Sequence, residues 1–276
     1  MKQTAKNSGF KMKDCGLFHI PYSTFLVFLI ALLLTSCNVR MERSRTTDHE
    51  PIVSADREVA AFERIQLMGS PTIYYTQGDT ITVCVEAPQE LVEFIETEVR
   101  DSTLFVKLRD DAQSFVKHIV FFNDDDVKVY VTSPDLVEVS LTGSGEFVSK
   151  KRIDTDNLLL TLRGSGDIKL SDVICDHLIT SAVGSGDIDI DNLETQTSHI
   201  ELVGSGDVEV SHVNVALIDI LLKGSGDVKS FFKNCGDVSA DLRGSGDISL
   251  SGNVRSIKQN TLGSGDFDTS GLVIGQ

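Results

Sequence analysis

The sequence predicts an all-β fold: a single-stranded parallel β-helix of about 20 residues per coil, preceded by an N-terminal β-rich cap. Three observations predict it: a recurring four-residue word, a period-two apolar pattern within each repeat, and no long helical pattern in any repeat. The word is Gly-Ser-Gly-Asp, with Glu replacing Asp once, and its copies are separated by 21, 20, 20, 20, 20 and 19 residues. It begins at Gly143, Gly164, Gly184, Gly204, Gly224, Gly244 and Gly263.

The residues between the words form strands by their periodicity. Counting the first glycine as zero, offset 4 is apolar in every repeat, from Phe147 to Phe267. Offsets 14, 16 and 18 are mostly apolar, as in Ile218, Ile220 and Leu222. One such coil cannot bury its apolar row alone, so the coils must stack, with a spacing of about 4.8 Å. We therefore expect residues 137–276 to form the β-helix.

Residues 61–136 carry no regular word and are predicted to form the cap. Alternating segments indicate strands at 62–67, 80–85, 103–108 and 127–131, and the apolar spacing over Gln89–Val99 predicts one short helix. Leu67–Ile73 repeats the spacing Leu-x-Gly-Ser-x-x-Ile of the later words and is predicted to be a degenerate first coil. An atypical terminal repeat is what a solenoid needs to cover its open end. An independent domain with its own binding role is the alternative.

The N-terminus reads as a secretory signal peptide over residues 1–36. Four lysines precede an apolar run at 25–34 that is too short to span a bilayer and that ends in Leu34-Thr35-Ser36-Cys37. This ending resembles a bacterial lipobox, which implies that Cys37 becomes the lipidated first mature residue and anchors the protein to a membrane. An ordinary secretory cleavage is the alternative. Residues 37–60 are polar and aperiodic, and are predicted to form a flexible tether.

The mature chain is strongly acidic. The full sequence has 25 basic and 41 acidic residues, and removal of residues 1–36 takes away four lysines and one aspartate, leaving 21 against 40, a formal charge of −19. Such a charge excludes nucleic acid as a partner and disfavours anionic lipid head groups.

Stacking predicts an outward row of seven carboxylates, here called the acidic ladder. It contains Glu146, Asp167, Asp187, Asp207, Asp227, Asp247 and Asp266. The glycines of the word are expected to point inward, where they allow a tight bend or approach to the opposite wall. Neighbouring carboxylates about 4.8 Å apart repel by roughly 1 kcal/mol even in water.

Two interpretations account for how that repulsion is offset. In the first, each carboxylate accepts hydrogen bonds from its own turn amides and the adjacent serine, and basic neighbours such as Lys169 and Lys223 neutralise some rungs. In the second, four carboxylates without basic neighbours bind a divalent cation weakly, calcium being the preferred ion. Those four are Asp187, Asp189, Asp207 and Glu209. We expect no other cofactor.

The sequence shows no catalytic constellation. Coil length varies by one residue either way, so no loop can build the walls of a cleft, and a polysaccharide-degrading enzyme is the least favoured reading. The histidines at 118, 177, 199 and 212 lie at unrelated phases, which predicts no metal cluster. Cys175 and Cys235 share offset 11 but lie three coils apart, about 14 Å, too far for a disulfide. We expect both to be buried, and Cys84 to be unpaired.

The lipobox, the strand Phe62–Ile65 leading to Gly69-Ser70, and the recurrent words together resemble the bacterial family called the putative auto-transporter adhesin head GIN domain. The resemblance covers about residues 60–276. It implies a parallel β-helix related in shape to pectin-lyase-like folds, and a secreted or lipid-anchored location in the cell envelope. It implies no ligand and no functional residues.

Two functions follow as hypotheses. The first is a lipid-anchored, non-catalytic envelope module for binding or adhesion, at the outer membrane, with a polysaccharide or envelope protein as partner. The second is a structural or sensory periplasmic lipoprotein; the sequence leaves the periplasmic and surface faces open. Phe231 and Phe232 are the adjacent aromatic candidates for sugar binding. The short segment Phe267–Gln276 offers little material for a second cap, so a homodimer is expected to cover that end.

Overall fold

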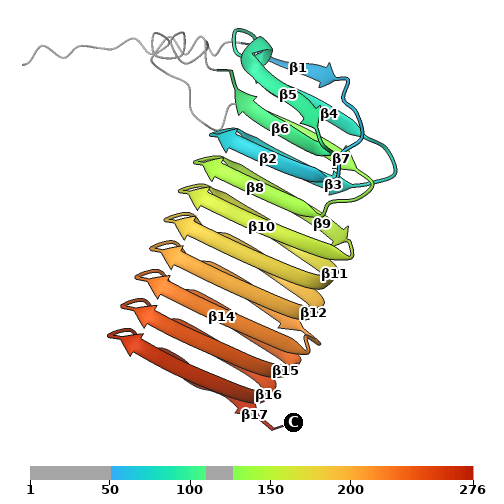
Figure 1. The fold of residues 1–276 in the computed structure, drawn as a ribbon. Coiled ribbons are helices and arrows are strands. Elements are labelled where there is room, and N and C mark those ends of the chain that lie inside the picture. Colours follow the sequence, from blue (N-terminus) through green and yellow to red (C-terminus); the bar gives the residue numbers. More distant parts are fainter. Residues whose placement is uncertain (1–50, 110–126, 276) are drawn as a thin grey trace, which may run out of the picture. The chain divides into compact units, whose positions relative to one another are not determined.

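The computed structural model describes residues 51–109 and 127–275, and within them the fold is all-β. The signal peptide, Cys37, most of the expected tether and His118 lie outside the described residues. No helix in the described ranges is long and apolar enough to cross a membrane. Figure 1 shows the strands from β8 (Glu138–Gly143), next to the cap, to β17 (Phe267–Ile274) at the C-terminal end stacked in chain order.

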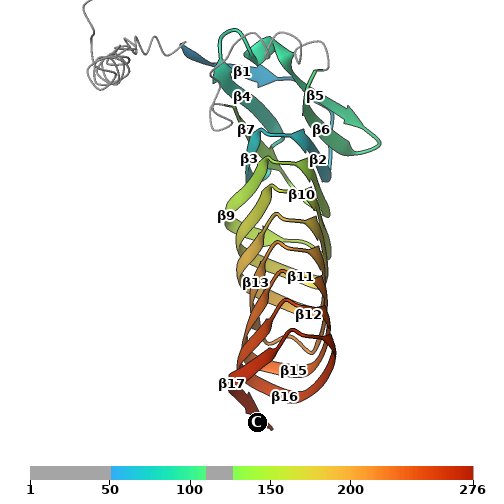
Figure 2. The ribbon, with the colours of Figure 1, turned by 90° about the vertical axis from the view of Figure 1, so that its left-hand side faces the viewer.

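Each coil of the repeat region contributes strands to two faces, which Figure 2 shows side by side. The first face follows the word and carries β9, β13, β17 and the N-terminal parts of the long strands β11, β12, β15 and β16. The second face precedes the next word and carries β8, β10, β14 and the C-terminal parts of those long strands. The bounds are β8 (Glu138–Gly143), β9 (Glu146–Asp154), β10 (Asn157–Gly164), β11 (Asp167–Gly184), β12 (Ile188–Gly204), β13 (Val208–Val213), β14 (Leu217–Gly224), β15 (Val228–Gly244), β16 (Ile248–Gly263) and β17 (Phe267–Ile274).

The coils stack in parallel and in register, as the repeat predicts. Gly164 pairs with Gly184 and Gly184 with Gly204, while Ile168 pairs with Ile188. The offset-4 side chains form one buried row that is 0% exposed from Phe147 to Ile248. The prediction of a parallel β-helix with about 20 residues per coil is therefore confirmed.

The cap begins with the degenerate coil, and this prediction is also confirmed. Strands β2 and β3 pair in parallel with β8 and β9, so that Gly69 aligns with Gly143 and Ile73 with Phe147. On the far side, β6 and β7 add to β2 and β3 in parallel. The bounds of the cap elements are β1 (Ile52–Arg57), β2 (Arg64–Gly69), β3 (Thr72–Gln77), β4 (Thr82–Pro88), η1 (Val92–Phe94), β5 (Ile95–Arg100), β6 (Thr103–Leu108) and β7 (Lys128–Ser133).

Antiparallel strands end both faces at the cap. On one face β5 pairs with β6, and on the other β4 pairs with β7 and β1 pairs with β4, all antiparallel. Beneath them Leu91, Val92 and Ile95 are buried in the common core. Strand β1 lies within residues 37–60, so the expectation of a flexible tether is wrong for residues 52–57.

The helix expected over Gln89–Val99 is also wrong. One 3₁₀ turn, η1, is present, and the chain then enters β5, whose residues Ile95 and Arg100 pair with Leu108 and Thr103 of β6. The two-residue connection at Asp101 and Ser102 has φ values of 49° and 58°, the conformation of a tight hairpin turn. Pairing along this hairpin outweighs a local apolar spacing that suits a helix.

The glycines of the word allow close stacking of coils. Gly204 has a φ of 144°, and a Cβ added there would lie 2.0 Å from the carbonyl oxygen of Gly184. Gly206 would place its Cβ 2.1 Å from the carbonyl oxygen of Gly186. The glycines therefore lie close to the backbone of the preceding coil. The expectation that they approach the opposite wall of the β-helix is wrong.

Candidate functional site

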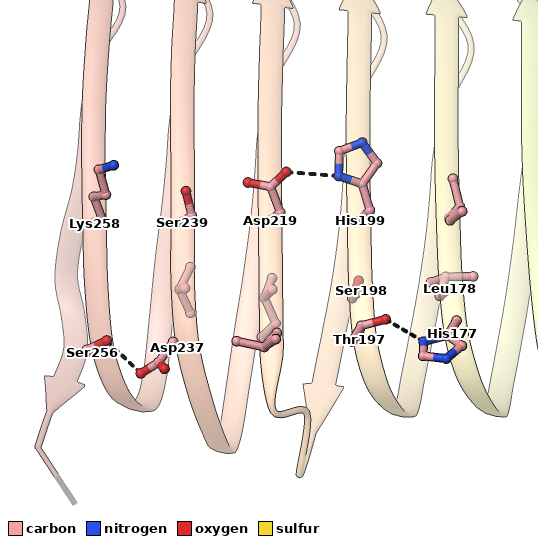
Figure 3. A pocket seen from close by; sticks show the side chains of 14 residues that line it. His177, Leu178, Thr197, Ser198, His199, Asp219, Asp237, Ser239, Ser256 and Lys258 are labelled. Atoms are coloured by element: carbon pink, nitrogen blue, oxygen red, sulfur yellow. Dashed lines mark hydrogen bonds and ion pairs between the residues drawn. The ribbon is translucent and has the colours of Figure 1, made fainter.

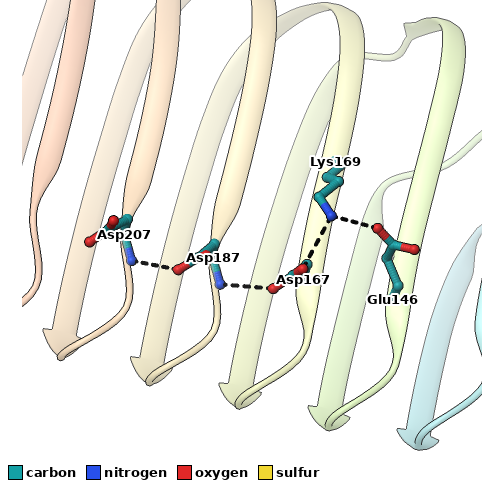
Figure 4. A network of polar contacts seen from close by, with 5 residues as sticks. All are labelled: Glu146, Asp167, Lys169, Asp187 and Asp207. Atoms are coloured by element: carbon teal, nitrogen blue, oxygen red, sulfur yellow. Dashed lines mark hydrogen bonds and ion pairs between the residues drawn. The ribbon is translucent and has the colours of Figure 1, made fainter. Parts of the chain in front are cut away.

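The acidic ladder links successive coils through backbone amides (Figure 4). From Asp187 onward, each aspartate donates its backbone N–H to the Oδ1 atom of the aspartate one coil earlier. The N···O distances are 3.4 Å for Asp187, 2.8 Å for Asp207, 3.1 Å for Asp227, 3.0 Å for Asp247 and 2.9 Å for Asp266. The expectation that each carboxylate accepts hydrogen bonds from the amides of its own turn is therefore wrong. The carboxylate oxygen accepts from the backbone amide of the following coil instead.

One lysine neutralises the N-terminal end of the ladder. Lys169 Nζ lies 2.7 Å from Glu146 and 3.2 Å from Asp167, and these carboxylates raise the pKa of the lysine, Glu146 most strongly. Lys223 instead pairs with Glu201 at 2.8 Å, away from the ladder. The rungs from Asp187 onward form no ion pair among the described residues, and the carboxylates from Asp187 to Asp247 are held by the amide contacts.

The four carboxylates expected to bind a cation do not form a metal-binding cluster. In the part of the chain that the structure describes, no group of three or more His, Cys, Asp or Glu side chains could hold a metal ion. Asp187 and Asp207 each use Oδ1 to accept a backbone amide, while Asp189 pairs in register with Glu209 on the next strand. Burial raises the pKa of Asp189, and the charges of Asp187 and Glu209 raise it further.

The second face carries an open groove of about 750 Å³, here called the outer groove (Figure 3). Two outward rows line it, each with one side chain from β11, β12, β14 and β15. The first row contains His177, Thr197, Leu217 and Asp237, in register across the four strands. The second row contains Ile179, His199, Asp219 and Ser239. Stacking therefore brings together side chains that lie about 20 residues apart in sequence.

Polar side chains of the outer groove pair with one another across the coils. His177 Nδ1 lies 2.8 Å from Thr197 Oγ1, and His199 Nδ1 lies 2.9 Å from Asp219 Oδ2. At the C-terminal end of the groove, Arg255 and Ser256 bind the carboxylate of Asp237 and lower its pKa to about 2, Arg255 most strongly.

Two aliphatic side chains of the outer groove are open to solvent. Ile179 is 48% exposed and Leu217 is 53% exposed. Leu217 lies in register between the polar residues Thr197 and Asp237, and Ile179 lies between Leu159 and His199. The sequence reasoning missed this site, because it followed each coil along the chain. Comparing offsets 13 and 15 across the coils would have found it.

The two phenylalanines proposed for sugar binding separate. Phe231 is 50% exposed on the first face, whereas Phe232 is 0% exposed in the core, where its ring lies 5.4 Å from that of His212. The pair is therefore no sugar platform.

The third histidine of the described residues and two of the cysteines lie in the interior. His212 is buried, its Nε2 lies 3.1 Å from Ser198 Oγ, and burial lowers its pKa to about 3. Cys175 and Cys235 are buried and unpaired, as expected, and Cys84 is also a free thiol.

Stacked coils, a β-rich cap and a repetitive outer surface define a repeat protein of the β-solenoid class. The chain belongs to the family described as "Putative auto-transporter adhesin, head GIN domain", whose model matches residues 61–253 and 198–276. The match confirms the resemblance seen in the sequence. The adhesin-like family supports a location at the cell envelope or surface.

Solved structures share the fold. One, described as a "putative adhesin" from Bacteroides fragilis NCTC 9343, has a TM-score of 0.70 and 23% identity over 81% of this chain and 98% of its own. A "putative adhesin" from Parabacteroides distasonis ATCC 8503 has a TM-score of 0.64 and 18% identity over 82% and 98%. A "putative lipid binding protein" from the same organism has a TM-score of 0.63 and 21% identity over 82% and 98%. Comparison with curated proteins gives no match.

Proposed function

We propose that this protein is a lipid-anchored, non-catalytic binding or adhesion module of the cell envelope, and that it holds a protein partner in the outer groove. The observation that carries the proposal is the exposure of Ile179 and Leu217, about half of each side chain, within a groove of about 750 Å³. Exposed aliphatic groups rimmed by polar side chains are typical of interaction sites. The adhesin-like family supports the same class of function.

The lining of the groove favours a protein over a glycan. Sugar rings are usually held by exposed aromatic side chains, and no Phe, Tyr or Trp is among the residues that line the groove. Aliphatic side chains beside polar pairs, such as His199 with Asp219, instead suit a partner that presents apolar side chains and hydrogen-bonding groups.

The order of residues in the second row of the groove argues against a Ser-His-Asp triad there. In the second row Asp219 lies between His199 and Ser239, because the three residues pair in register on β12, β14 and β15. A serine nucleophile needs the imidazole beside it, with the carboxylate on the far side of the ring. Here the imidazole and the hydroxyl are separated by the carboxylate strand.

Site-specific photocrosslinking in intact cells tests the groove. A photoreactive amino acid is placed at 179 or at 217, and the matched control carries it at 231, where Phe231 is 50% exposed on the other face. We expect the same discrete protein adduct from positions 179 and 217 and a much weaker one from 231. Equal adducts from all three positions, or none from the groove, would contradict the proposal.

Protease treatment of intact cells separates adhesion from a structural or sensory role in the periplasm. An adhesin must be cleaved on intact cells, whereas a periplasmic protein is cleaved after the outer membrane is permeabilised. If the protein resists the protease on intact cells but still gives an adduct in the outer groove, it is a binding module of the periplasm and not an adhesin.

A further inference from the structure

We propose that the C-terminal end of the β-helix binds a second copy of this chain, tail to tail, through antiparallel pairing of the last strands. This surface meets the outer groove at Lys258, which lines the C-terminal end of the groove, but the inference does not depend on the proposed function. It rests on four observations: open strand edges, uncovered core positions, a covered N-terminal end and complementary charges.

The last coil has unpaired edges on both faces. Within the described residues, β17 pairs with β16 and with no other strand, and residues 256–263 of β16 pair with β15 alone. The backbone groups along the other side of these segments point away from the stack. Exposed strand edges are ready to pair with another chain.

Apolar side chains at inward positions are left uncovered beside these edges. Ile274 pairs with Val254, which is 1% exposed, yet Ile274 itself is 57% exposed. Phe267 ends the offset-4 row and is half-buried, although the preceding members of the row are 0% exposed. Ile257 and Leu272 are likewise partly buried against the core. A further layer of strands would remove these side chains from water, which is favourable.

The opposite end of the molecule cannot supply that layer. In the described part of the cap, β1 and β5 lie antiparallel at the ends of the two faces, and Leu91 and Val92 are buried beneath the cap. A head-to-tail contact would therefore bring an uncovered core against a covered one. The surface that matches the C-terminal end is the same end of a second copy, which gives a closed two-fold dimer. A two-fold axis perpendicular to the stack reverses strand direction, so the new pairing is antiparallel.

The two-fold dimer can form in two ways, by pairing β16 of one copy with β17 of the other or by pairing β17 with β17. The charges on these strands favour the first. The outward side of the terminal β16 segment carries Lys258, and the outward side of β17 carries Asp268. When β16 of one copy pairs with β17 of the other, these opposite charges lie on the same side of the new sheet, twice per dimer. Pairing β17 of one copy with β17 of the other would instead bring the two Asp268 side chains of the dimer towards each other. Gln259 and Thr261 are polar and exposed at inward positions of β16, so we expect a reversible dimer.

Sedimentation equilibrium of the mature chain carrying Cys37→Ser, which removes the lipid, tests the proposal. We expect a concentration-dependent rise from the monomer mass to twice that mass. Lys258→Asp should weaken the dimer by about tenfold or more, and the double variant Lys258→Asp with Asp268→Lys should restore it. Ile274→Lys should also give monomers. Lys150→Asp, an exposed change far from the end, is the matched control and should leave the dimer intact.

Thermal unfolding of each variant shows whether it is folded, so loss of the dimer is not confused with loss of the fold. A single monomer mass at all concentrations would overturn the proposal. So would a dimer that persists in both Ile274→Lys and Lys258→Asp, because its interface would then lie elsewhere.

Discussion

The backbone N–H of Asp207 donates to Oδ1 of Asp187 in the preceding coil, across 2.8 Å. The same contact recurs up to Asp266, which accounts for an aspartate at the same place in consecutive coils. Each carboxylate gains a donor that partly offsets repulsion from its neighbours, and each coil gains a side-chain contact that fixes its register. Stacking of the coils therefore explains the recurrence of the ladder aspartates.

Replacing Asp207 by Ala should lower the free energy of unfolding by about 1 kcal/mol, because the N–H of Asp227 loses its acceptor. Asp207→Asn keeps an oxygen acceptor and removes one charge from the row, so it should be as stable as the wild type or slightly more stable. Urea unfolding followed by circular dichroism measures both. If Asn destabilises as much as Ala, the charge and not the acceptor is what matters.

The stacking was predictable because it depends on strict spacing. Offset 4 identified the buried row, and the spacing of Leu67–Ile73 identified the first coil, whose Gly69 aligns with Gly143. The helix over Gln89–Val99 was wrongly predicted because apolar spacing there suits both structures, and only the partner strand β6 decides. The acceptor for each ladder amide was missed because it lies on another coil.

The outer groove was harder to predict than the core. A buried row must be apolar in every coil, so one repeat reveals it, whereas an outward row has no such constraint. His177, Thr197, Leu217 and Asp237 differ in chemistry, and their proximity follows from the parallel register alone. A site of this kind becomes visible in sequence only after the coils are aligned with one another.

The stacking glycines give a second prediction. Gly206→Ala places a Cβ 2.1 Å from the carbonyl oxygen of Gly186, far closer than two non-bonded atoms can approach, so the coils must separate locally. We expect a loss of about 3 kcal/mol in the free energy of unfolding, or failure to fold. Ser205→Ala, an exposed neighbour in the same word, is the control and should change little. Equal stability of both variants would refute the stacking explanation.

Lipid attachment gives a third prediction, on a residue outside the described ranges. Cys37→Ser should abolish incorporation of labelled fatty acid and move the protein from the membrane fraction to the soluble fraction. Cys84→Ser is the matched control, because Cys84 belongs to the folded part of the chain and should leave lipid labelling unchanged. Labelling that survives Cys37→Ser would place the anchor elsewhere.

The buried imidazole of His212 gives a pH dependence. Burial lowers its pKa to about 3, against an ordinary value of 6.5 in the unfolded chain. The unfolded state therefore binds a proton more readily below pH 6.5. Titration of His212 therefore leaves the free energy of unfolding unchanged above that pH and lowers it progressively as the pH falls towards 3. Between pH 6.5 and pH 5 the loss from this one group should reach about 2 kcal/mol.

Replacing His212 by Phe removes this term, because a phenyl ring can occupy the place beside Phe232 without titrating. The difference in unfolding free energy between His212→Phe and the wild type, measured at pH 7, 6 and 5, should therefore grow in favour of the variant as the pH falls. Carboxylates titrate equally in both proteins and cancel in this difference. A difference that stays constant with pH would show that His212 is not held neutral in the folded protein.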